Sequence, residues 1–200
     1  MKIRLLTVFG ASVLLTGVAL SQQAPTPAPA PDKVDQRREN QQDRIANGVQ
    51  SGQLTAGETR NLEGREANLN NEIKDDRQAN GGRLTQAERQ QVNRQQNHIS
   101  RSIYQDKHNS ATQNYKGQVG ARQENQQDRI AQGIRSGQMT AGEASRAEGQ
   151  QQRINNQIRA DRQANGGKLT PGERQQINQR QNNASRNIYN KKHNGATQAH

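Results

Sequence analysis

The sequence predicts an all-α protein: two tandem three-helix modules that follow a signal peptide and a Pro-rich linker, with an elongated and partly flexible arrangement as one alternative. Apolar residues recur at steps of four, seven and eleven, which keep side chains on one face of a helix, whereas a strand requires steps of two. A helix-start motif occurs four times. The chain also repeats itself without a gap at an offset of 85 residues, and 47 of 78 positions are identical between 38–115 and 123–200.

The first 21 residues have the pattern of a secretory signal peptide. Lys2 and Arg4 form a positive start, a short apolar stretch follows, and Ala19-Leu20-Ser21 fits the small-x-small cleavage pattern. We therefore expect an exported protein, periplasmic or extracellular, with no transmembrane segment after processing. Residues 22–33 contain APTPAPAP, which favours a semi-rigid polyproline II spacer.

The two modules are expected at 34–115 and 122–200, joined by a linker at 116–121. Their apolar stripes are narrow, because residues 22–200 contain only 19 Leu, Ile, Val and Phe side chains. This content indicates a thin, coiled coil-like bundle, and leaves partial disorder or self-association as alternatives. The expected helices are 34–50, 56–79 and 86–108 in the first copy, and 119–135, 141–164 and 171–193 in the second.

Four predicted helices begin with an apolar residue followed by Thr-x-x-Glu, which is the capping box. In this motif the Thr hydroxyl accepts a hydrogen bond from the Glu amide, and the Glu carboxylate accepts one from the Thr amide. A Gly lies shortly before each Thr, where a preceding helix commonly ends in a left-handed residue. The capping pairs are Thr55 with Glu58, Thr85 with Glu88, Thr140 with Glu143, and Thr170 with Glu173.

The same segments look like the second half of an EF-hand loop, so a degenerate calcium binder is one alternative. An EF-hand needs oxygen ligands at loop positions 1, 3 and 5. Counting back from Glu88 places Arg77, Ala79 and Gly81 there. Because the ligand half is missing, the sequence predicts helix connections, no metal and no cofactor.

The stretches LTQAERQQVNRQQN at 84–97 and LTPGERQQINQRQN at 169–182 resemble the LTxxQ motif of the Spy/CpxP family of periplasmic helical proteins. Glu88 and Glu173 stand where that family has Gln. The resemblance implies an all-helical ATP-independent chaperone or envelope-stress protein, whose partners would be client proteins. The tandem unit is also similar to uncharacterised exported bacterial repeat proteins, which imply no function.

Nothing in the sequence predicts an enzyme. The chain has no Cys, and no Ser is placed with a His in a nucleophile-and-base arrangement. The carboxylates are spread among Arg residues, which predicts surface ion pairs.

Charge differs between the two copies. Residues 38–115 carry 11 Lys and Arg against 10 Asp and Glu, whereas residues 123–200 carry 12 against 6. Part of the difference comes from three substitutions: Asp106, Glu66 and Gln50 in the first copy correspond to Lys191, Gln151 and Arg135 in the second. We expect these positions on the surface. A basic exported protein favours anionic polymers such as lipopolysaccharide, teichoic acid or extracellular nucleic acid.

The sequence predicts the anion-binding residues near the ends of the third helices, where a Tyr is flanked by cations at helical spacing. The alternative is a Tyr ring packed against the core with solvated cations around it. The predicted binding residues there are Arg101, Tyr104, Lys107, His108, Arg186, Tyr189, Lys191, Lys192 and His193. Arg135, at the end of the predicted helix 119–135, joins them because of the charge difference between the copies.

Overall fold

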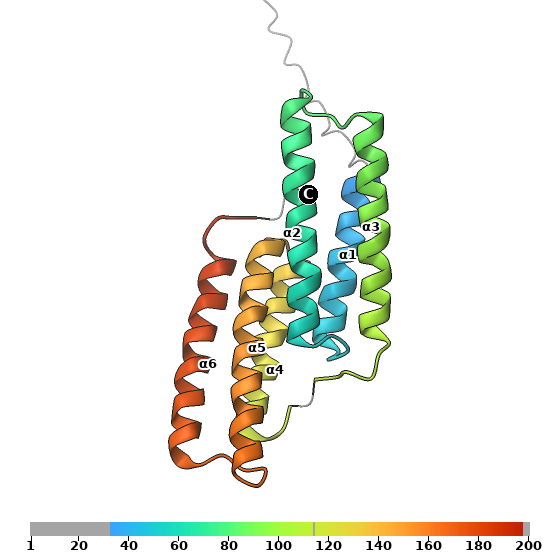
Figure 1. Cartoon of the computed structure of the whole chain (residues 1–200). Helices are drawn as coiled ribbons and strands as arrows, with labels where there is room; N and C mark the ends of the chain where they lie inside the picture. Colours follow the sequence, from blue (N-terminus) through green and yellow to red (C-terminus); the bar gives the residue numbers. More distant parts are fainter. Residues whose placement is uncertain (1–32, 114, 198–200) are drawn as a thin grey trace, which may run out of the picture. The chain divides into compact units, whose positions relative to one another are not determined.

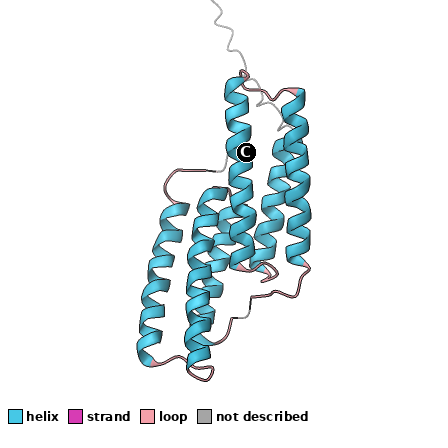
Figure 2. Cartoon of the chain, viewed as in Figure 1, coloured by secondary structure: helices cyan, strands magenta, loops and turns pink. Residues whose placement is uncertain are grey.

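The computed structural model describes residues 33–113 and 115–197, and this part of the chain forms six α-helices and no strand (Figures 1 and 2). The predicted all-α class is confirmed, and each helix starts and ends within two residues of its predicted bounds. The predicted signal peptide, and the linker up to residue 32, lie outside the described residues. The helices are α1 (Lys33–Gln50), α2 (Ala56–Ala79), α3 (Gln86–Lys107), α4 (Gly117–Arg135), α5 (Ala141–Ala164) and α6 (Pro171–Lys192). None of these described helices is both long and apolar enough to cross a membrane.

Local sequence explains where the helices begin and end. Complete capping boxes open α2, α3, α5 and α6. In α3, for example, Thr85 Oγ1 accepts from the Glu88 amide at 3.3 Å, and Glu88 Oε2 accepts from the Thr85 amide at 2.7 Å. The predicted left-handed Gly before each box is also present, with φ of 90° at Gly82 and 89° at Gly167. These contacts satisfy backbone groups that a helix end would otherwise leave without a partner.

The two repeats pack against each other through α1 with α4 and α2 with α5, and α2 with α5 is the most extensive pairing. Residues 85 positions apart meet directly at this interface. Arg135 Nη2 donates to Gln50 Oε1 at 2.9 Å, and Ser145 Oγ donates to the Arg60 carbonyl at 2.9 Å. Contact between equivalent positions is the signature of two-fold packing, here within one chain.

The hydrophobic core follows from this packing. Leu62 and Leu69 of α2 belong to the same buried cluster as Ile130 of α4 and Ala144 of α5. A smaller cluster, which includes Ile177, lies within the second repeat. The larger cluster therefore spans both repeats and is not confined to one of them.

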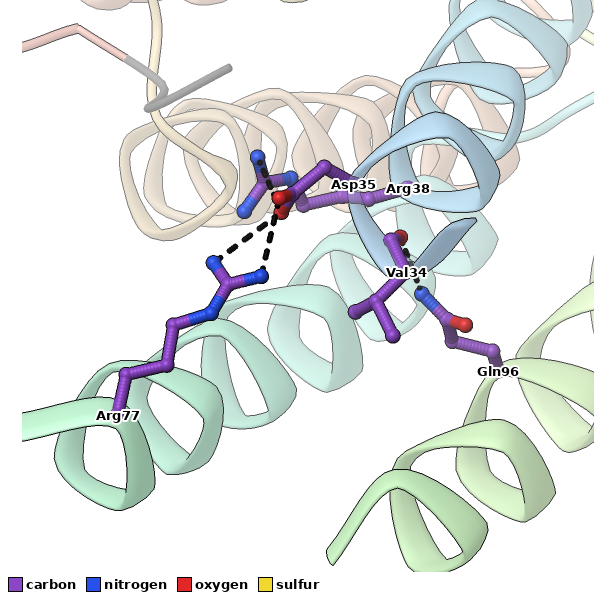
Figure 3. Close-up of polar contacts among 5 residues, drawn as sticks. All are labelled: Val34, Asp35, Arg38, Arg77 and Gln96. Carbon is purple, nitrogen blue, oxygen red and sulfur yellow. Dashed lines mark hydrogen bonds and ion pairs between the residues drawn. The ribbon is translucent and has the colours of Figure 1, made fainter. Parts of the chain in front are cut away.

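Polar side chains also contribute to the core. Gln96 is fully buried on α3, and its Nε2 donates to the Val34 carbonyl at 2.9 Å (Figure 3). Gln41 of α1 donates in return to the Gln96 carbonyl at 2.7 Å. These bonds hold α1 against α3, and Gln181 makes the equivalent bond to Val119 at 2.9 Å.

The prediction that the carboxylates form surface ion pairs is wrong for several of them. Glu63, Glu66 and Glu148 are fully buried, and Asp35 is buried between two cations. Figure 3 shows the Asp35 carboxylate facing both guanidinium groups, 3.2 Å from Arg38 Nη2 and 3.0 Å from Arg77 Nη2. The Glu66-to-Gln151 difference is therefore a change in the core and not on the surface.

Candidate anion-binding groove

A groove of about 690 Å³ is lined by residues of α2, α5 and α6. Four cationic side chains line it. Arg60 comes from α2, Arg146 and Arg153 from α5, and Lys191 from α6. The rest of the lining is Ser145, Gly149, Gln150, Asn187, Asn190 and Asn194. The groove thus combines positive charge with amide and hydroxyl groups, and both repeats contribute to it.

The local fold explains how these side chains converge. Residues 146, 149, 150 and 153 lie at helical steps of three and four on one face of α5. Gly149 leaves room for the Arg60 side chain, because a Cβ atom there would lie 3.3 Å from Arg60 Cδ.

The four cations are not neutralised by neighbouring acids. None of them forms an ion pair with any described residue. The carboxylate near one end of the groove, Glu143, already accepts hydrogen bonds from Asn194 at 2.6 Å and from the Thr140 amide at 3.1 Å. Burial raises the pKa of Glu143, but these hydrogen bonds and the charge of Lys191 lower it overall. Arg60 Nη1 donates to Gln152 Oε1 at 3.3 Å, and this neutral partner leaves the charge of Arg60 uncompensated.

The first repeat does not carry the same charges at the equivalent positions. Asn61, Asn68 and Asp106 stand where the second repeat has Arg146, Arg153 and Lys191. Much of the charge difference between the copies is therefore gathered in a single groove. This arrangement favours an anionic ligand on the second repeat.

The predicted tyrosines lie elsewhere and are exposed. Tyr104 and Tyr189 stack on His108 and His193, with ring centroids 4.2 and 4.1 Å apart. The alternative of a Tyr ring packed against the core is therefore wrong. Tyr104 and Arg101 line a separate small groove, together with Arg44.

The other predicted binding residues do not gather at one place. Arg135 donates to Asn47 and Gln50 and so joins the two repeats. Lys192 donates to Gln132 at 2.9 Å, Arg186 bonds Asn183, and the Lys107 side chain lies beside Gly48. Of the predicted set, only Lys191 lines the large groove.

Sequence reasoning missed Arg60, Arg146 and Arg153, because α2 and α5 meet only in the folded chain. A signal was present in the alignment of the two copies, where Asn61 becomes Arg146 and Asn68 becomes Arg153. Among the described residues, no three His, Cys, Asp or Glu side chains are grouped as metal ligands. Comparisons with protein-family models, curated proteins and solved structures found no match to this chain.

Proposed function

We propose that the protein is a non-enzymatic binder of phosphorylated or sulfated polymers, and that the groove on α5 is its contact surface. The observation that carries this proposal is the convergence of Arg60, Arg146, Arg153 and Lys191 from three helices without an ion pair among the described residues. Exported polymers of this chemistry include lipopolysaccharide, teichoic acid and extracellular nucleic acid.

The chemistry of the side chains fits such a ligand. Arg presents a planar fork that matches phosphate or sulfate oxygens, and Lys adds a flexible point charge. The neighbouring Asn187, Asn190 and Asn194 amides can donate to sugar hydroxyls or to further oxygens. Binding would release counterions from the polymer, so affinity should fall steeply as salt rises.

A chaperone of the Spy/CpxP type would require an apolar surface for unfolded clients. Among the described residues, Tyr104 and Tyr189 are the exposed large hydrophobic side chains, and the aliphatic residues are mostly buried. The available apolar surface is small, which favours the polyanion proposal over the chaperone alternative.

The test uses the full chain and a variant that carries the first repeat's residues, Arg146→Asn, Arg153→Asn and Lys191→Asp. A matched control changes exposed cations away from the groove by the same total charge, Arg83→Asn, Arg94→Asn and Lys168→Asp. Affinity for heparin, lipopolysaccharide and DNA is measured over a range of salt, and circular dichroism checks that both variants fold.

Near physiological salt, the groove variant should bind each polymer at least about tenfold more weakly than the parent. Its slope of log affinity against log salt should be shallower than that of the parent by about 3. The control should stay close to the parent. Equal losses in the two variants would mean that total charge and not the groove governs binding. Parent binding that is insensitive to salt would overturn the proposal.

A further inference from the structure

The interior between the repeats contains three carboxyl groups with few hydrogen-bond donors. Glu63 on α2 and Glu148 on α5 occupy equivalent positions, and Glu66 lies one turn further along α2. All three are fully buried. Both oxygens of Glu66, and one oxygen each of Glu63 and Glu148, accept no hydrogen bond. An ionised carboxylate in these surroundings would lose its hydration without adequate replacement.

The second repeat shows what chemistry position 66 requires. Gln151 replaces Glu66, and its Nε2 donates to Gln126 Oε1 at 3.1 Å. Gln126 corresponds to Gln41, and both glutamines donate through Nε2 to the third helix of their own repeat. Gln41 Oε1, however, has no donor. A proton on Glu66 would supply that donor, as the amide of Gln151 does in the second repeat.

The cation that faces Glu66 is already engaged. Arg38 of α1 acts on Glu66 by its charge, but its guanidinium lies 3.2 Å from the Asp35 carboxylate (Figure 3). Asp35 is shared with Arg77, which lies 3.0 Å away. In the second repeat Gln123 replaces Arg38.

The groups that face the other two acids are neutral or acidic. Gln42 of α1 donates to Glu63 Oε2 at 3.3 Å, and Gln127 of α4 donates to Glu148 Oε2 at 2.9 Å. Glu66 and Glu148 both act on Glu63 by like-charge repulsion. Tyr115, which precedes α4, lies within range of Glu148, and burial raises the pKa of its hydroxyl.

We propose that the paired repeats hold these buried carboxyl groups in the protonated form, Glu66 above all, and that the core between α2 and α5 loosens when the protons are lost. Burial raises the pKa of Glu66 and of Glu148 to about 8, and that of Glu63 well above its usual value. The unfolded chain ionises near 4.5. The folded state therefore binds more protons between these values, and stability falls as pH rises from about 4.5 to about 8.

This pH dependence bears on the groove, a consequence that rests on the proposed function. Arg60 comes from α2, whereas Arg146 and Arg153 come from α5. Loosening of the α2–α5 pairing would disperse the cations, so anion binding should weaken in alkaline solution.

The test measures thermal unfolding of the full chain without ligand from pH 5 to pH 9, for the parent, Glu66→Gln and the exposed control Glu124→Gln. Glu66→Gln gives position 66 the same residue that the second repeat has at the equivalent position, Gln151. Its melting temperature should exceed that of the parent by a margin that widens with pH, to roughly 5 °C or more at pH 8. The control should follow the parent. Infrared spectra of the parent at pH 6.5 should show a protonated carboxyl band that weakens in Glu66→Gln.

A Glu66→Gln protein that is less stable than the parent throughout, with no change in the infrared band, would overturn the inference and indicate an ionised Glu66 held by Arg38. The infrared titration of the parent decides the matter if the variant does not fold. Heparin binding measured at pH 6 is a separate readout. Its absence would remove the proposed function and leave the carboxyl titration standing.

Discussion

The capping boxes that begin α5 and α6 have the same Thr-x-x-Glu motif but should contribute differently to stability. Glu173 is partly exposed, and its carboxylate accepts hydrogen bonds from Thr170 and Asn165 at the start of α6. Glu143 is buried, and beyond its own box it accepts from Asn194 at 2.6 Å, which joins the end of α6 to the start of α5. Glu173→Ala removes a cap and an exposed bond from Asn165 in the adjoining turn, whereas Glu143→Ala removes a cap and a part-buried bond from Asn194, 51 residues away.

A lost cap costs about 1 kcal/mol, and a lost hydrogen bond to a charged group adds about 1.5–3 kcal/mol. We therefore expect a small loss of stability for Glu173→Ala and a loss of about 3 kcal/mol for Glu143→Ala. At roughly 2–4 °C for each kcal/mol, the second variant should melt several degrees below the first. Circular dichroism melts of the full chain at pH 7 measure both losses.

Repeating the melts at acidic pH provides a control for the comparison of Glu173→Ala with Glu143→Ala. The pKa of Glu143 is lowered in the fold, because hydrogen bonds and Lys191 outweigh burial, and the pKa of Glu173 is lowered chiefly by the Thr170 amide. Their stabilisation is present above the usual carboxyl pKa and is lost as pH falls through the folded value. The gap between parent and Glu143→Ala should shrink in acid. Equal losses for the two variants at pH 7 would refute the reasoning.

Four further outcomes are expected. Glu148→Gln should gain stability over the parent by a margin that widens as pH rises from 4.5 to 8, because burial raises the pKa of the parent carboxyl to about 8 and the folded state resists its ionisation; urea unfolding at several pH values measures this. Gly64→Ala should stabilise α2 by up to about 1 kcal/mol, since the added Cβ would meet only Ser145 Oγ at 3.5 Å; a lower melting temperature would contradict it. Millimolar calcium should leave the melting curve unchanged, because Glu88 and Glu173 already accept hydrogen bonds within their capping boxes; a shift of several degrees would favour the EF-hand alternative. Equimolar protein should suppress client aggregation only weakly in a light-scattering assay, and strong suppression would favour the chaperone alternative.

The sequence by itself determined the helices. Apolar spacing, Thr-x-x-Glu boxes and the Gly residues before them act over a few residues, so their effect can be read without knowing the fold. The repeat was equally visible, since it depends only on matching positions 85 apart. For this reason the bounds from α1 to α6 agree closely with the pattern.

Only the tertiary structure decided which helix faces meet and therefore what the polar residues do. Helical spacing places Glu66 and Glu72 on α2 but cannot show that Glu66 is fully buried while Glu72 is only partly buried. It cannot bring Arg60 to within 3.3 Å of Gln152, because those residues lie 92 positions apart. The groove and the buried carboxyl groups both arise from the pairing of α2 with α5, and a contact between two separate helices leaves no periodic signal in either one.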